Sequence, residues 1–315
     1  MPNSPTHEYD VILPIETGTR LPVVRKVSPS DLVTVLKKGV DDFWAMPTHV
    51  VFIGIVYAVA GLLIARAALG YEFVPLLYPL VAGFALLGPF AAIGLYELSR
   101  RREMGRDTSW RHMFDFLHSP SLGSIAVLAV LLVVVFLIWI ATANAMYVTR
   151  FGHQNVTSLT AFINQIVTTP QGLSLFVVGN AVGLVFAAAV LSLTVVAFPL
   201  LLDRHVGIAT AMATSLVAVA KNPLTMVLWG LIVAFGLFLG ALPFLIGLAL
   251  VIPILGHATW HLYRAVVEPD TGARPEYKPP PKYKPSIASG NLWSLNGENT
   301  TISAPWFARS SRLSG

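Results

Sequence analysis

The chain has 315 residues, of which 55% are hydrophobic and only 12% are charged, and its mean hydropathy is +0.69. A water-soluble domain carries about twice that share of charged residues, so the composition indicates an integral membrane protein. The net charge of +5 does not indicate nucleic-acid binding, because the basic residues lie beside apolar runs and are not interleaved with aromatic side chains. The absence of cysteine excludes disulfides, thiolate metal sites and cysteine nucleophiles.

The chain divides into a central apolar domain, residues 29–268, and two polar tails. Residues 1–28 and 269–315 are rich in Pro, Ser, Asn and Gly and have no periodic apolar pattern, so we expect both tails to be disordered. The second tail is Pro-rich at residues 276–286, which favours a polyproline II conformation.

Six apolar segments in the central domain are long enough to cross a membrane. A bilayer core of about 30 Å requires roughly 20 apolar residues in a helix. The sequence therefore predicts an all-α, polytopic membrane protein with six transmembrane helices. The predicted spans are residues 47–69, 73–98, 120–146, 172–202, and two within 223–264 that are separated by a break at 240–244.

Basic residues mark one side of these spans. They precede the first span and follow the second, while the opposite side carries little more than Arg66, Glu72 and Arg150. Positive charge on short loops marks the cytoplasmic face, so we expect a multi-pass membrane protein with both termini in the cytoplasm. The residues that give this topology signal are Lys37, Lys38, Arg100, Arg101, Arg102 and Arg106.

Three cytoplasmic segments, residues 29–47, 108–120 and 206–223, have apolar residues at helical spacing and each ends at a proline. In the first, Leu32, Leu36, Val40, Phe43 and Trp44 form the apolar face, and the acidic residues, including Asp41 and Asp42, lie opposite. We expect amphipathic helices at the membrane interface, with Trp44, Trp110 and Phe114 at headgroup level.

The recurrence of these helices predicts a three-fold internal repeat, each unit an interfacial helix followed by a helical hairpin. Ser119 and Asn222 precede the prolines as predicted N-caps. Small residues in the second and fourth spans predict close packing of helices inside the domain, at Gly83, Gly88, Gly179 and Gly183.

The string GFALLGPFAAIGLYELSRRREMG, residues 83–105, resembles the bacterial integral membrane proteins catalogued as domain-of-unknown-function family 2189. The similarity extends over residues 30–265 and includes Trp44 and Pro47 at the end of the first amphipathic segment. The resemblance implies a bacterial cytoplasmic-membrane protein with no assigned activity, so it supplies no catalytic residues. On the same helix, Glu97 and Arg100 are three residues apart and predict a structural ion pair.

Little in the sequence points to chemistry. His257 and His261 share one side of a helix and are the candidate metal ligands, but histidines at the interface need no ligand, so we predict no metal, haem or other cofactor. The span centres carry no ionisable residue, which argues against a proton relay. A pathway for a neutral solute or a lipid would pass near Pro89, Asn180 and Pro199.

No motif of a hydrolase, a nucleotide-binding protein or a zinc enzyme is present. The leading hypothesis is a non-enzymatic membrane protein that acts as an accessory or assembly component of another membrane complex through its cytoplasmic helices. Its partners would be the lipid bilayer and that protein complex. The alternatives are a transporter or lipid-handling protein and, third, a haem or metal protein.

Overall fold

A computed structural model describes residues 21–46, 74–153, 156, 158–242 and 247–269, and within them the chain is helical with no β-strand. The longer helices are α1 (Asp31–Ala45), α3 (Val74–Phe84), α5 (Ile93–Glu103), α6 (Leu122–Phe151), α7 (Leu159–Thr168), α8 (Pro170–Thr194), α10 (Ile208–Lys221), α11 (Pro223–Ala241) and α12 (Leu248–Val266). Shorter elements are η2 (Ala85–Leu87), α4 (Gly88–Ala91), α9 (Ala197–Asp203) and a 3₁₀ helix, η3 (Trp110–His118).

Four helical stretches of the described residues are long and apolar enough to cross a membrane. They are Val74–Glu103, Leu122–Phe151, Pro170–Asp203 and Pro223–Ala241. The prediction of an all-α membrane protein is confirmed for the described residues, which contain four candidate spans. The expected first span, 47–69, lies outside the described residues, and α12, the expected sixth span, is not among the four.

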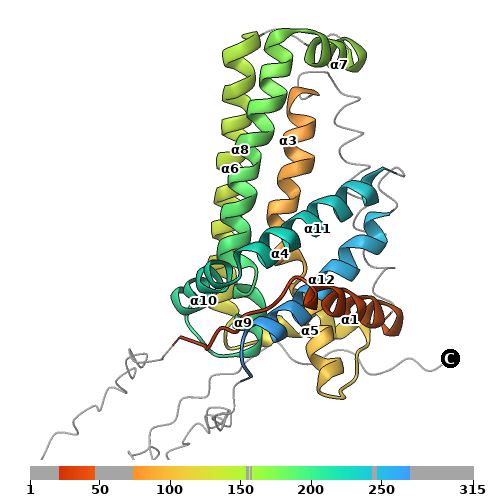
Figure 1. The fold of residues 1–315 in the computed structure, drawn as a ribbon, viewed down its shortest axis with the longest axis vertical. Coiled ribbons are helices and arrows are strands. Elements are labelled where there is room, and N and C mark those ends of the chain that lie inside the picture. Colours follow the sequence, from red (N-terminus) through yellow and green to blue (C-terminus); the bar gives the residue numbers. More distant parts are fainter. Residues whose placement is uncertain (1–20, 47–73, 154–155, 157, 243–246, 270–315) are drawn as a thin grey trace, which may run out of the picture. The chain divides into compact units, whose positions relative to one another are not determined.

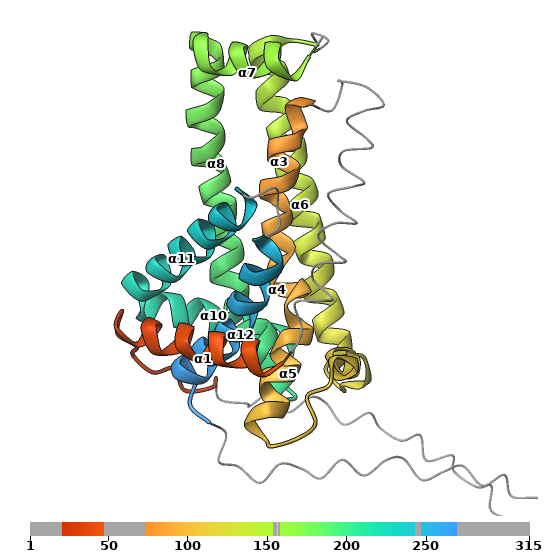
Figure 2. The same cartoon turned by 90° about the vertical axis from the view of Figure 1, so that its right-hand side faces the viewer.

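The helices α3, α6 and α8 run side by side, and the short helix α7 lies across one end of α6 and α8 (Figures 1 and 2). The predicted spans 120–146 and 172–202 leave residues 147–171 as their connection, and no helix was predicted within it. The Ser158 hydroxyl caps the start of α7 by accepting a hydrogen bond from Ala161 N at 3.1 Å, and Thr169, which follows α7, caps the start of α8 because its Oγ1 accepts one from Gly172 N at 3.0 Å.

Two of the prolines inside the spans, Pro89 and Pro199, coincide with interruptions of the helices. A turn of 3₁₀ helix precedes Pro89, which stands at the start of α4, and the chain turns at Val195 and Val196 before α9, which contains Pro199. Proline removes a hydrogen bond and clashes with the preceding turn, which explains these breaks. Pro253 lies inside α12 without ending it.

All three amphipathic segments are helical, as α1, η3 and α10, but their buried faces differ in part from the expected ones. On α1 the expected polar residue Asp42 is buried, whereas Trp44 is 80% exposed. Compared with the expected orientation, α1 is turned about its axis so that Asp42 faces inward and Trp44 faces outward. Gly39 allows this because it permits close contact with Ala258 of α12. On α10 the small residues Ala211 and Ala218 face inward.

Residues 21–28 also differ from the expectation, because they are not part of a disordered tail. Val24 forms an antiparallel bridge with Val267, and Arg25 N donates to Val266 O at 2.7 Å. The side chain of Asn222 accepts from Val27 N at 2.7 Å and donates to Arg25 O at 3.0 Å. Asn222 therefore occupies the predicted cap position without capping α11, since its amide binds the N-terminal segment instead.

The most deeply buried side chains lie where α5, α9 and α12 meet. Leu95, Leu98, Phe198, Trp260 and Tyr263 are all essentially inaccessible to solvent. By contrast, α6, α8 and α11 expose many large apolar side chains, as expected of helices that contact lipid. The packed core is therefore at the end of the bundle that carries the arginine cluster.

Candidate functional site

The last turn of α5 places polar side chains on two faces. Ser99, Arg102 and Glu103 are separated by three and four residues and contact α1 and α12. Arg100 and Arg101 point to the other side, where they pair with Glu97 and with η3. The short arginine-rich string thus connects three separate elements.

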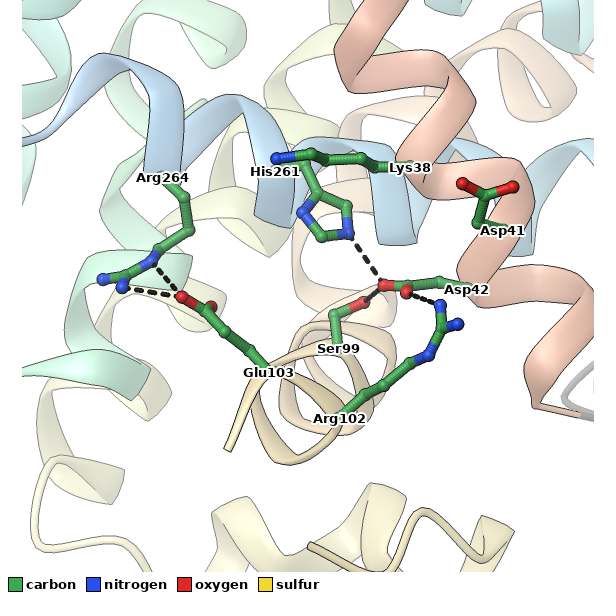
Figure 3. A pocket seen from close by; sticks show the side chains of 8 residues that line it. All are labelled: Lys38, Asp41, Asp42, Ser99, Arg102, Glu103, His261 and Arg264. Carbon is green, nitrogen blue, oxygen red and sulfur yellow. Dashed lines mark hydrogen bonds and ion pairs between the residues drawn. The ribbon is translucent and has the colours of Figure 1, made fainter. Parts of the chain in front are cut away.

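Asp42 of α1 is the centre of the candidate site (Figure 3). It is 3% exposed and accepts hydrogen bonds from Ser99 Oγ at 2.5 Å, from His261 Nε2 at 2.9 Å and from the Arg102 guanidinium. Its donors are far away in the sequence, on α5 and α12. One carboxylate therefore joins three helices.

A second histidine extends this network inward. Ser99 Oγ donates to Asp42 and also lies 2.8 Å from His257 Nδ1, so the network continues from the carboxylate through the serine to a buried imidazole. In a hydrolase triad the histidine stands between the serine and the carboxylate. Here the serine stands between the other two and is buried, so the arrangement is that of a structural polar network.

Electrostatics favour an ionised Asp42. Burial by itself raises the pKa of this carboxyl, but the hydrogen bonds from His261, Ser99 and Arg102 outweigh it, and the pKa lies below the ordinary value of 3.8. At neutral pH the site therefore holds a buried negative charge that is compensated from two neighbouring helices.

A second polar group lies one turn further along α12. The Arg264 guanidinium pairs with Glu103 at 2.7 Å and lies 3.6 Å from Asp203, which in turn accepts from the Tyr263 hydroxyl at 2.7 Å. The indole of Trp260 donates to Glu103 at 3.1 Å. These contacts connect α12 to α5 and α9.

The two groups face an open pocket of about 330 Å³. The residues that line it carry acidic and basic side chains in equal number, together with one histidine and one serine. The lining residues are Lys38, Asp41, Asp42, Ser99, Arg102, Glu103, His261 and Arg264 (Figure 3). Most of these charges already pair with one another, so the pocket is a polar recess between packed helices.

Ion pairs also hold η3 against α5. Glu97 pairs with Arg100 at 2.8 Å, as the sequence predicted, and Arg101 pairs with Asp115 of η3 at 2.7 Å. His112 Nδ1 lies 2.8 Å from the same Asp115 oxygen. The arginines proposed as topology signals therefore also stabilise the fold.

The other predicted topology residues lie at the surface. Lys37 and Lys38 are on the exposed face of α1, and Arg106 follows α5 on an exposed turn. The aromatic residues expected at headgroup level are all exposed: Trp110 and Phe114 by about half, and Trp44 at the end of α1 by 80%.

The four glycines of the predicted packing stripes separate into two groups. A Cβ at Gly83 would lie 2.6 Å from Trp139 Cδ1, and one at Gly183 would lie 3.2 Å from Trp139 Cη2, so both glycines make room for this indole. Nothing among the described residues lies within 4 Å of the corresponding positions at Gly88 and Gly179.

The two candidate metal ligands, His257 and His261, bind Ser99 and Asp42 respectively. In the described part of the chain, no three His, Cys, Asp or Glu side chains are grouped so that they could hold a metal ion. Asn180, the strongest polar group at a span centre, accepts a hydrogen bond from the Tyr78 hydroxyl at 2.7 Å and thereby connects α8 to α3.

Sequence reasoning did not predict the contacts that Asp42, Ser99 and Asn222 make between distant segments. The one available signal was the Asp41–Asp42 pair within an otherwise regular amphipathic helix, in which one carboxylate must face partly inward. Ser99 lies inside the string that carries the family resemblance, but a serine in a helix has no distinctive spacing.

The fold and the polar network define a class: an α-helical integral membrane protein with helices packed across one end of its bundle. Residues 77–203 match the model of a family described as "Predicted integral membrane protein (DUF2189)". This match confirms the resemblance seen in the sequence and adds no activity. No curated protein and no solved structure matches the chain.

Proposed function

We propose that this protein is a non-enzymatic accessory or assembly component of a bacterial membrane complex. It would present the exposed aromatic side chains of α1 and of η3, which pack on different faces of α5 and are together termed here the aromatic platform, to a partner protein in the same membrane. The observation that carries this proposal is the exposure of large aromatic side chains on helices that are themselves firmly anchored.

The exposed aromatic residues of the aromatic platform are Trp44, Trp110 and Phe114, with exposed fractions of 80%, 50% and 49%. Tryptophan and phenylalanine are enriched at the centres of protein interfaces and contribute most of the binding energy there. Tryptophan also favours the membrane interface, so the bilayer is the competing occupant of this surface.

The platform is rigidly supported. Asp42 attaches α1 to α5 and α12, and the Arg101–Asp115 pair attaches η3 to α5. A binding surface loses less conformational entropy on association when its elements are held in place beforehand. This support favours a recognition surface over a loosely attached interfacial helix.

The distribution of charge supports the proposed orientation. The exposed basic residues Lys37, Lys38 and Arg106 lie at the end of the bundle that carries the platform, which supports a cytoplasmic position for that end and for both termini. The proposed location is the inner membrane. A non-enzymatic role is supported by the pocket, whose Ser99 hydroxyl is already engaged with Asp42.

The test is purification of the full-length protein from its native membrane in a mild detergent, followed by mass spectrometry of bound proteins and lipids. A Trp44→Ala/Trp110→Ala variant is compared with a Phe176→Ala/Phe235→Ala control. The control removes two aromatic side chains of similar exposure from α8 and α11.

A stoichiometric partner that accompanies the wild type and the control but not the platform variant would support the proposal. A partner retained equally by all three proteins would place its binding site elsewhere. A protein that carries only one specific lipid or solute would contradict the accessory role and favour the lipid-handling alternative. An optical spectrum of the same sample with a Soret band would reveal haem.

A further inference from the structure

We propose that α11 and α12 form a re-entrant hairpin, which enters the membrane from the side of the arginine cluster, turns near the bilayer midplane and returns. Its partner is lipid: the outer face of α11 would contact the acyl chains of that one leaflet. The argument uses the ends of the hairpin, its depth, the composition of its turn and its exposed face.

Both ends of the hairpin lie on the same side, because one short segment binds them both. Asn222, immediately before α11, accepts from Val27 N at 2.7 Å. Just after α12, Glu268 N donates to Val23 O at 3.0 Å. The hairpin therefore begins and ends at the level of residues 23–27.

The depth of α11 follows from its contact with α8. A Cβ on Gly230 would lie 3.2 Å from Leu191 Cδ2, so these residues are at one level. From Gly230 to Gly240, ten residues raise the chain by at most about 15 Å at 1.5 Å per residue. From Leu191 back to Pro170, α8 continues for 21 residues, or about 31 Å. The turn thus stops roughly 15 Å short of the far end of α8.

The second helix gives a consistent depth. Gly256 of α12 packs directly on Leu95 of α5, and a Cβ on Gly39 of α1 would lie 2.6 Å from Ala258 Cβ. Only eight residues, about 12 Å, separate Gly256 from the start of α12 at Leu248. In Figures 1 and 2 the end of α11 and the start of α12 accordingly lie well below α7, and both helices are inclined.

The turn has the composition of a segment buried in hydrocarbon. Residues 240–247 read GALPFLIG, without one polar side chain, whereas residues 152–169, which join α6 to α8, contain His, Gln, Asn, Ser and Thr. No Asp, Glu, Lys or Arg occurs between Lys221 and Arg264. The glycines bring the helices close, since a Cβ on Gly247 would lie 2.8 Å from Gly240 Cα.

One face of α11 is exposed and wholly apolar along its length, at spacings of three and four residues. It consists of Leu224, Val227, Leu231, Phe235, Phe238 and Leu242. Lipid chains fit this face because it carries no hydrogen-bonding side chain, and because it lies beside helices long and apolar enough to span the bilayer.

Single-cysteine labelling tests the proposal, and the cysteine-free chain gives no background. Leu242→Cys probes the tip, His153→Cys the loop at the far side, and Met104→Cys the side of the arginine cluster; all three positions are exposed. Leu239→Cys and Leu250→Cys are second probes near the tip. A membrane-impermeant maleimide is applied to intact spheroplasts, to permeabilised membranes and to denatured protein.

We expect His153→Cys to react in intact spheroplasts and Met104→Cys only after permeabilisation. The tip cysteines should react at least about tenfold more slowly in both membrane samples, because apolar surroundings suppress the thiolate, and fully after denaturation. Reaction of Leu242→Cys in spheroplasts at the rate of His153→Cys would show a complete crossing and overturn the proposal. Rapid reaction only after permeabilisation would place the tip in cytoplasmic water and overturn it as well.

Lipid contact at the tip is tested with a nitroxide attached to Leu242→Cys in reconstituted protein. Faster relaxation by dissolved oxygen than by a water-soluble nickel chelate is expected, because oxygen concentrates in hydrocarbon. Equal insensitivity to both reagents would mean that protein, not lipid, covers α11, and would refute the lipid-facing part of the proposal.

Discussion

At the scale of single residues, the buried charge of Asp42 is the most consequential feature. A buried carboxylate is costly unless it is paired and hydrogen-bonded, and here its donors come from two other helices. Such a network contributes less to the net free energy of unfolding than to the selection of one packing of α1 against α5 and α12, because other packings would leave the charge without its donors.

Replacing Asp42 by Asn should therefore destabilise the protein by about 2 to 3 kcal/mol, because Arg102 and His261 lose a charged acceptor while the shape of the side chain is kept. The measurement is thermal unfolding in detergent. Asp41→Asn is the matched control, since Asp41 is the preceding residue on the same helix and is exposed. If both substitutions lowered the melting temperature equally, the effect would come from the loss of one negative charge on α1 and not from the hydrogen bonds of Asp42.

The same residue predicts a dependence on pH. Because the pKa of Asp42 is lower in the folded state than the ordinary 3.8, its contribution to stability is fully present above that value and is lost as the pH falls through the lower, folded value. Between about pH 6 and pH 3, the gap in melting temperature between wild type and Asp42→Asn should narrow. A gap that stays constant or widens toward acid would show that Asp42 is not stabilised as the carboxylate.

At the scale of elements, the sequence predicted which segments are helical better than it predicted how they face one another. The apolar spacing of residues 29–47 located α1 correctly, yet it placed Asp42 on the exposed face and Trp44 on the buried one. Asp42 binds Ser99 and His261, which lie 57 and 219 residues away in the sequence. No local sequence pattern contains both a carboxylate and such distant partners. The helix α7 was missed because it has only ten residues and is not recognised beside a 30-residue span.

The contact of α1 with α12 depends on one glycine. A Cβ on Gly39 would lie 2.8 Å from both Ala258 N and Ile254 O, which are backbone atoms and cannot move aside alone. Gly39→Ala should lower stability by roughly 1 to 3 kcal/mol and increase protease cleavage of α1.

Gly179→Ala is the control for this substitution. It lies inside α8 with nothing among the described residues within 4 Å, so alanine should be neutral there or stabilising by up to about 1 kcal/mol through its helix propensity. Limited proteolysis and thermal unfolding in detergent measure both variants. Comparable losses at the two positions would contradict a specific contact at Gly39.

The N-terminal segment should be released by changing one amide. Asn222→Ala removes its two hydrogen bonds to Val27 and Arg25, and leaves the buried Val27 N–H without its acceptor. Hydrogen–deuterium exchange at residues 21–28 should accelerate by about tenfold or more, as expected for a loss near 1.4 kcal/mol. Asn164→Ala, at an exposed position of α7, should leave this exchange unchanged.

At the scale of the whole molecule, the arginine string that ends α5 serves two requirements at one place. As positive charge beside a span it favours retention on the cytoplasmic side, and as a set of ion-pair donors it joins α5 to α1 and η3. The two roles are compatible. The side of the membrane on which basic residues are retained is also the side on which water can hydrate those parts of their side chains that form no ion pair.

The orientation is tested with reporter fusions to the whole chain. A fluorescent protein fused after Gly315 should fluoresce and alkaline phosphatase fused at the same place should be inactive, because the first folds in the cytoplasm and the second needs the oxidising side of the membrane. Alkaline phosphatase inserted after His153, in the loop that precedes α7, should be active, since α6 separates this loop from the arginine cluster. The reverse pattern would invert the molecule and place the aromatic platform outside the cell. Because the proposed hairpin returns to its side of entry, this result is the same whether or not α11 crosses the bilayer, so fusions and cysteine labelling test separate claims.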